Sequence, residues 1–311
     1  MKITVIGAGN VGATAADCVA RKDMVDEVVL IDIVEGLPQG KALDIQQSAP
    51  IHLFDTRVVG TNHYKDTAGT DIAIITAGSP RKPGMSRDDL LSINARIVRA
   101  VTEQLVAHSP NAILIVVSNP LDVMTYVAYK KSGFPSERVM GMAGVLDTAR
   151  YRAFIAAELG CSVRDIQALL MGGHGDTMVP LPRYTTVGGI PLPELMPAEK
   201  IDAIVERTKF GGGEIVKLMG TSAWYAPGAA AAEMAEAIVK NSGRVLPCAA
   251  MVNGQYGLND LFIGVPVRLG TGGVQKVLDI PLTDAERAML NASAENVRTN
   301  IEALERLDAQ G

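Results

Sequence analysis

The chain has 311 residues, of which 48% are hydrophobic and 20% charged, and its formal net charge is −5. This length predicts one large domain or two closely packed ones. A negative chain without a basic run excludes the electrostatic pattern of nucleic-acid binding, and no apolar run is long enough to span a membrane. Three dispersed cysteines indicate neither a disulfide framework nor a metal site. We therefore expect a soluble cytoplasmic protein without metal, nucleic-acid or membrane partners.

Short, mostly apolar runs in the first half are typical of parallel strands that are covered on both faces. The predicted strands are 2–9, 27–33, 56–61, 71–78, 112–120 and 138–144. Helical patterns lie between them, and the clearest, at 86–109, has apolar residues at helical spacing. Repeated strand–helix–strand units predict right-handed crossovers and a Rossmann-type, doubly wound parallel sheet.

The pattern changes after about residue 144 and becomes a mixture of helices and turn-rich strands. The expected elements are a helix at 147–160 ending at Gly160, a long helix at about 211–241, a glycine-rich hairpin region at 244–278 and a final helix at about 283–308. We predict a dinucleotide-binding domain over 1–144 and a mixed α/β substrate-binding domain over 145–311. No flexible linker separates them, so a tight interface is expected.

The stretch "VIGAGNVG" places Gly7, Gly9 and Gly12 between a predicted strand and a helical pattern. The first glycine permits a tight turn, the second lets the backbone approach a pyrophosphate, and the third lets helix and strand pack closely. Asp32 ends the next strand, where a carboxylate accepts hydrogen bonds from a ribose diol and repels a 2′-phosphate. This predicts NAD rather than NADP. The alternative is an ordinary strand–turn–helix in which Asp32 caps a strand end.

Three charged clusters outside this motif are candidates for a catalytic and substrate-binding site. They are Arg81, Lys82 and Arg87 in the loop 79–90, Asp147 and Arg150 in "VLDTAR", and His174 in "MGGHGDTMVP". Oxidation of a hydroxy acid needs a base near neutral pH, a carboxylate that orients it, and cations for the substrate carboxylate and the reacting carbonyl. These residue types fit those roles.

Each of these residues also has an ordinary interpretation. Asp147 is typical of a helix N-cap, Arg150 of a solvated arginine, and a lone histidine is more often structural than catalytic. An NAD-sensing regulator without catalysis is the alternative to an enzyme. The other three histidines, His52, His63 and His108, lack glycine neighbours and charged motifs, so we assign them no role.

Six motifs in chain order resemble the lactate/malate dehydrogenase family over residues 2 to about 308. They are "VIGAGNVG", "LIDI", "AGSPRKPGMSRDDLL", "VSNPLDVMT", "LDTARYR" and "GGHGDTMVP". The resemblance is closest to the malate dehydrogenases of the lactate-dehydrogenase-like branch. It implies NAD-dependent, reversible oxidation of (S)-malate to oxaloacetate in the tricarboxylic acid cycle, by a homodimer or homotetramer. Lactate or another 2-hydroxy acid is the alternative substrate.

The resemblance also implies a role for each matching residue. His174 is the proton acceptor and donor, and Asp147 is its carboxylate partner. Arg150 binds the C1 carboxylate of the substrate. Arg87, on a closing loop, polarises the carbonyl, and Arg81 binds the second carboxylate. The implied cofactor-binding residues are Gly7, Gly9, Asn10, Val11, Gly12, Asp32, Asn94, Val117 and Asn119, the last of which also contacts substrate.

Overall fold

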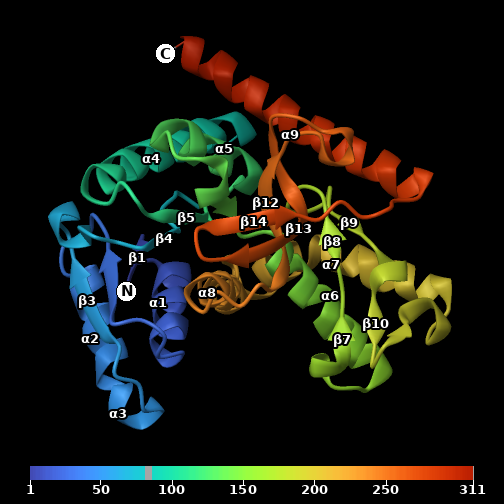
Figure 1. The fold of residues 1–311 in the computed structure, drawn as a ribbon, viewed down its shortest axis with the longest axis horizontal. Helices are drawn as coiled ribbons and strands as arrows, with labels where there is room; N and C mark the ends of the chain where they lie inside the picture. Colours follow the sequence, from blue (N-terminus) through green and yellow to red (C-terminus); the bar gives the residue numbers. More distant parts are fainter. Residues whose placement is uncertain (81–85, 311) are drawn as a thin grey trace.

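The computed structural model describes residues 1–80 and 86–310, and a nine-stranded sheet with helices on both faces dominates it (Figure 1). Its six parallel strands run in the order β3-β2-β1-β4-β5-β6. They are β1 Lys2–Ile6, β2 Glu27–Ile31, β3 Arg57–Thr61, β4 Ile72–Ile75, β5 Ile113–Val116 and β6 Val139–Gly141. This order is that of a doubly wound dinucleotide-binding sheet, which confirms the predicted fold class.

Most of the predicted strands continue past the last residue that is paired in the sheet. Gly7 follows β1, Asp32 follows β2, and Val117 to Asn119 follow β5. Burial does not explain all of the continued apolar pattern, because Val117 is buried whereas Ile33 is 93% exposed. Since the carboxyl ends of parallel strands meet at one edge, the overhanging residues gather where ligands bind in such folds.

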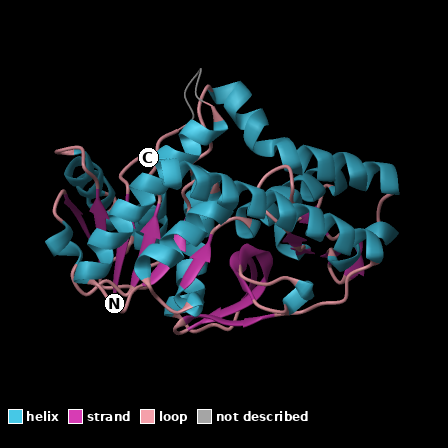
Figure 2. Cartoon of the chain, turned by 90° about the horizontal axis from the view of Figure 1, so that it is seen from above, coloured by secondary structure: helices cyan, strands magenta, loops and turns pink. Residues whose placement is uncertain are grey.

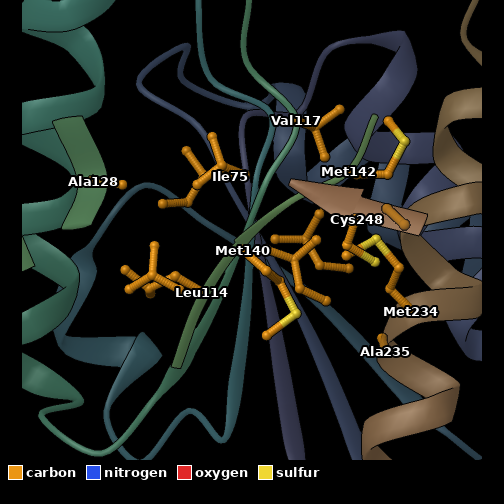
Figure 3. Close-up of a cluster of buried hydrophobic side chains, with 14 of the residues drawn as sticks. Ile75, Leu114, Val117, Ala128, Met140, Met142, Met234, Ala235 and Cys248 are labelled. Carbon is orange, nitrogen blue, oxygen red and sulfur yellow. The ribbon is translucent and has the colours of Figure 1, made fainter. Parts of the chain in front are cut away.

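Helices cover both faces of the sheet. In the described residues they are α1 Asn10–Arg21, α2 Leu37–Gln47, α3 Ala49–His52, α4 Arg87–His108, α5 Leu121–Ser132, α6 Gly144–Leu159, α7 Ala198–Met219, α8 Tyr225–Val239 and α9 Asp284–Gln310. Figure 3 shows sheet side chains enclosed between Ala128 of α5 and Met234 and Ala235 of α8. Figure 2 shows helices overlying the strands along the length of the molecule. Within the described ranges, no helix is both long and apolar enough to cross a membrane.

The first turn of α4 explains why this helix matches its prediction closely. The Ser86 hydroxyl accepts the Asp89 N–H at 3.0 Å, and the Asp89 carboxylate accepts the Ser86 N–H at 3.1 Å. This reciprocal capping satisfies two amides that the helix itself leaves free. The predicted ends at 160 and 308 also hold within two residues, since Gly160 ends α6 with a φ of 64° and α9 reaches Gln310.

Three antiparallel strands of the second half extend the same sheet beyond β6. They are β12 Val245–Val252, β13 Leu261–Gly270 and β14 Gly273–Val277, in the region predicted as a hairpin. β12 joins the parallel strands through the pairing of Ala249 with Gly141. The two halves of the chain therefore share one sheet, in agreement with the absence of a flexible linker.

The prediction of one long helix at about 211–241 is wrong. Two helices occupy this region, because α7 begins at Ala198 after Pro197 and ends at Gly220, whose φ is 72°. The left-handed backbone of Gly220 stops α7, and α8 restarts at Tyr225. Gly220, followed by the polar Thr221 and Ser222, was the available signal for this break.

The stretch Met171 to Pro180 forms a short hairpin. Its strands are β8 Leu170–Met171 and β9 Val179–Pro180, and a further small sheet contains β7 Ile166–Gln167, β10 Thr186–Val187 and β11 Ile190–Pro191. Gly172 exchanges backbone hydrogen bonds of 2.9 and 3.1 Å with Gly264 of β13. A Cβ on Gly264 would lie 2.3 Å from the Gly172 carbonyl oxygen, so this docking requires glycine. The His174 loop is thereby fixed to the main sheet.

Candidate active site

The glycine turn after β1 has the close packing that its sequence predicts. A Cβ on Gly12 would lie 1.8 Å from the Gly7 carbonyl oxygen, and Gly7 itself has a φ of 105°. Gly9 precedes α1 without a capping side chain, and the space beside it is open. Asn10 and Val11 form the first turn of α1. The exposed amides of this turn and the helix dipole suit the pyrophosphate of a dinucleotide.

Asp32 lies beside this turn and lines a cavity of about 320 Å³ together with Gly7, Gly9 and apolar residues of β2 and α4. Its carboxylate accepts the N–H groups of Ala8 at 2.6 Å and Val34 at 2.9 Å. Asp32 therefore caps the backbone, as the alternative interpretation proposed, and also faces the cavity. Each carboxylate oxygen can accept a further hydrogen bond, so the residues present fit an adenosine ribose.

His174, Asp147 and Arg150 come together, although the sequence alone did not show that they would. Nδ1 of His174 lies 2.9 Å from Oδ2 of Asp147, and a guanidinium nitrogen of Arg150 lies 3.2 Å from Oδ1 of the same carboxylate. The Asp147 side chain is only 3% exposed, and it lies inside the first turn of α6 rather than at the N-cap. Because Nδ1 donates to this carboxylate, Nε2 of His174 is the atom left for a substrate.

Opposing effects set the proton affinity of His174. Burial disfavours the charged imidazole and acts to lower its pKa. The charge and hydrogen bond of Asp147, with a further contribution from Asp122, outweigh burial and the opposing Arg150 charge, so the pKa of His174 is raised. The imidazolium therefore persists to higher pH than in water.

A cavity of about 430 Å³ unites residues from both halves of the chain. Val11, Val117, Asn119, Arg150 and His174 all line it, as expected of residues that meet cofactor and substrate. The Arg150 side chain is only 14% exposed, and its buried Nε has no hydrogen-bond partner. A guanidinium that lines a cavity suits an anionic ligand, because its accessible N–H groups can donate to a carboxylate.

Helix α7 also contributes to this cavity, which the sequence motifs did not predict. Lys209 lines the same cavity, and the following glycines pack beside Arg150. A Cβ on Gly211 would lie 3.3 Å from Cδ of Arg150. Three consecutive glycines inside a helix were the available signal, since each one weakens the helix and needs a packing reason.

Not every predicted site residue reaches this cavity. Asn94 is buried, and its amide binds the backbone of Ser79 and, at 2.7 Å, the carbonyl of Asn119. It therefore ties two strand-end loops together. Arg87 is the exposed first residue of α4 and is not among the residues lining the His174 cavity. Arg81, like Lys82, lies outside the described residues. The roles of Asn94, Arg87 and Arg81 stay predictions.

A dinucleotide-binding sheet with a glycine turn, and a cavity at its edge that holds a histidine bound to a buried carboxylate and an arginine, define a nicotinamide-dependent dehydrogenase. Residues 1–141 match the lactate/malate dehydrogenase NAD binding domain, and residues 144–307 match the alpha/beta C-terminal domain of the same family. The chain belongs to the lactate/malate dehydrogenase family, and NAD is the cofactor of its N-terminal part.

Individual relatives match the whole chain. A malate dehydrogenase of Salinibacter ruber is 67% identical over 311 residues, which are 100% of this chain and 99% of that protein. A solved structure of malate dehydrogenase from Salinibacter ruber has a TM-score of 0.97 at 65% identity and covers 100% of both chains. A Cryptosporidium parvum lactate dehydrogenase, solved with lactic acid and nicotinamide adenine dinucleotide, reaches 0.94 at 43% identity over 98% of both chains. The fold alone thus does not separate the two substrates.

Proposed function

We propose that this chain is an NAD-dependent malate dehydrogenase that interconverts (S)-malate and oxaloacetate. The observation that carries the proposal is that His174, bound to Asp147 through Nδ1, and the Arg150 guanidinium line one cavity. A 2-hydroxy acid presents a hydroxyl and a carboxylate on adjacent carbons, which is the spacing that a base beside a guanidinium recognises. The full-length identity to a malate dehydrogenase favours malate within this class.

In the proposed mechanism, bound NAD supplies the hydride acceptor of malate oxidation. Nε2 of His174 takes the hydroxyl proton of the substrate, while Asp147 orients the ring and stabilises its charged form. Arg150 holds the C1 carboxylate through two parallel hydrogen bonds. Arg87, assigned by resemblance, polarises the reacting carbonyl in the reverse direction. The apolar walls of the cavity, among them Val117 and Leu146, help to exclude water.

The assay that tests this proposal compares oxaloacetate with pyruvate in NADH oxidation. We expect kcat/KM to be higher for oxaloacetate by roughly 10²–10⁴-fold, since a buried cation left unpaired costs about 3–5 kcal/mol. Arg81 is the residue that we assign to the second carboxylate. Equal or higher kcat/KM with pyruvate would identify a lactate dehydrogenase instead, and NADH binding without turnover of any 2-oxoacid would identify a regulator.

The cofactor preference follows from Asp32. Its carboxylate faces the cavity beside the glycine turn, so the 2′-phosphate of NADPH would meet a negative charge. Like charges brought together cost several kcal/mol, so we expect NADH to be preferred by at least about 10²-fold in kcat/KM. Asp32→Ser should reduce the ratio of kcat/KM with NADH to kcat/KM with NADPH. Glu35→Gln, which changes an exposed residue of the same loop, should leave this ratio unchanged. A wild-type chain that uses NADPH as well as NADH would contradict this assignment.

The proposal also covers where the enzyme acts, how it assembles and where its domains divide. We place the enzyme in the cytoplasm and in the tricarboxylic acid cycle, as a homodimer or homotetramer, on the strength of the family resemblance. Light scattering from the purified chain would give its oligomeric state. The proposed domain boundary, between residues 144 and 145, lies at the start of α6, three residues before Asp147.

A further inference from the structure

Two side chains hold the His174 loop through consecutive backbone amides. The Gly173 N–H donates to Oγ of Ser293 on α9 at 2.7 Å, and the His174 N–H donates to Oδ2 of Asp122 on α5 at 3.0 Å. Gly173 leaves little space here, because a Cβ at this position would lie 3.3 Å from the same Asp122 oxygen. The loop backbone is therefore fixed from two helices.

Using Asp122 for that purpose costs free energy, because a carboxylate has to be buried. It is 7% exposed, and its second oxygen, Oδ1, is buried without a hydrogen-bond partner. Burial raises the pKa of Asp122 to about 6, against the effects of His174. Ser293 makes the equivalent bond at the neighbouring amide without a charge. A role in holding the backbone alone therefore does not explain a buried carboxylate with an unsatisfied oxygen.

Several charged groups surround this part of the site. Asp147 and Arg150 face it from α6, Asp176 lies on the His174 loop, and Lys209 lines the cavity from α7. Of the two carboxylates that act on the imidazole, Asp147 binds Nδ1 directly, whereas Asp122 acts through space. Asp122 also lies three residues after Asn119, so the first turn of α5 connects a cavity-lining residue to the histidine loop.

We propose that Asp122 is a positioning residue that fixes the His174 backbone and supplies a second negative charge beside the imidazole, which favours its proton-carrying form. The inference rests on the proposed dehydrogenase function. It assigns Asp122 to the reduction of the 2-oxoacid, because that direction requires a protonated His174 as the proton donor.

The direct test is an NMR titration of His174 in Asp122→Asn, with histidine labelled by ¹³C. The chain has four histidines, so the His174 signal is assigned by its loss in His174→Asn. Removing the charge is expected to lower the pKa of His174 by about one pH unit, the low end of the effect of a nearby charge. Ser293→Ala is the matched control, since it removes the adjacent hydrogen bond without changing charge. It should leave the pKa of His174 unchanged.

Kinetics and stability give two further readouts. The pH midpoint of oxaloacetate reduction should fall in Asp122→Asn as the pKa of His174 falls. The unfolding temperature at pH 8 should stay at or above the wild-type value, because the variant no longer buries a charge. The sign follows from the raised pKa of Asp122: its protonated form suits the fold, and that advantage is lost as pH rises from about 4 through about 6.

An unchanged His174 titration in a folded Asp122→Asn protein would overturn the inference. A strongly lowered unfolding temperature with an unmoved pH midpoint would also do so, since it would make Asp122 purely structural. If Asp122→Asn does not fold, Asp122→Ala serves as the second variant with the same expected fall. The two proposals fail separately, because a wild-type chain that reduces no 2-oxoacid overturns the function while the titration still tests the effect of Asp122 on His174.

Discussion

Replacing His174 with asparagine is expected to lower the turnover of oxaloacetate by at least about 10²–10⁴-fold, the range that a general acid or base supplies. The imidazole lines the same cavity as Arg150, and its Nδ1 is bound to Asp147, so Nε2 is the nitrogen left for the substrate. The affinity for NADH should change little, because Asp32 and most of the glycine turn line a different cavity. Steady-state kinetics and a fluorescence titration with NADH measure the two quantities.

The same residue predicts opposite pH dependence for the two directions. Burial opposes the imidazolium, but Asp147 and Asp122 outweigh it and raise the pKa of His174. Reduction should therefore fall, and malate oxidation should rise, as pH increases through that raised value. His52→Asn, an exposed histidine outside the cavity, is the control and should behave as wild type. Near-normal turnover in His174→Asn would remove this residue from the mechanism.

The parts of the fold that depend on local pattern were predictable from the sequence. Buried parallel strands are apolar along their length, and the glycine triplet fixes where β1 turns into α1. The need for glycine is strict at Gly12, where a Cβ would overlap the Gly7 carbonyl oxygen. Where only glycine fits, the glycine itself marks the position of the turn, so a single sequence is enough to locate it.

Features that depend on contacts between distant segments were not predictable in this way. Composition does not reveal that β12 pairs with β6, because an antiparallel strand added to a parallel sheet is also buried and apolar. Asp122 gave no signal either, since an acidic residue in the first turn of a helix is common on dipole grounds alone. Its partner, the His174 amide, lies 52 residues away in the chain. Arg150 was identified, but its unpaired Nε depends on packing that only the structure shows.

Replacing Arg150 with glutamine should have the second large effect, a loss of roughly 10²–10⁴ in kcat/KM for oxaloacetate. The Arg150 side chain is only 14% exposed and lines the cavity beside His174, where its guanidinium can bind a substrate carboxylate. Breaking a desolvated charge pair costs about 3–5 kcal/mol, because the remaining carboxylate is left buried and unpaired. The loss should fall mainly on substrate binding and orientation, so steady-state kinetics at saturating NADH should show a raised KM as well as a lowered kcat.

Two companion variants separate charge from geometry at this position. Arg150→Lys keeps the charge but not the planar fork, so it should recover only part of the lost kcat/KM. Arg164→Gln, which removes an exposed arginine outside the cavity, should leave the kinetics unchanged. Arg150 also opposes the imidazolium, so Arg150→Gln should move the pH midpoint of reduction upward, opposite to the shift expected for Asp122→Asn. Full activity in Arg150→Gln, or in Arg150→Lys with an unaltered KM, would show that the substrate carboxylate binds elsewhere, since neither side chain reproduces the bidentate contact.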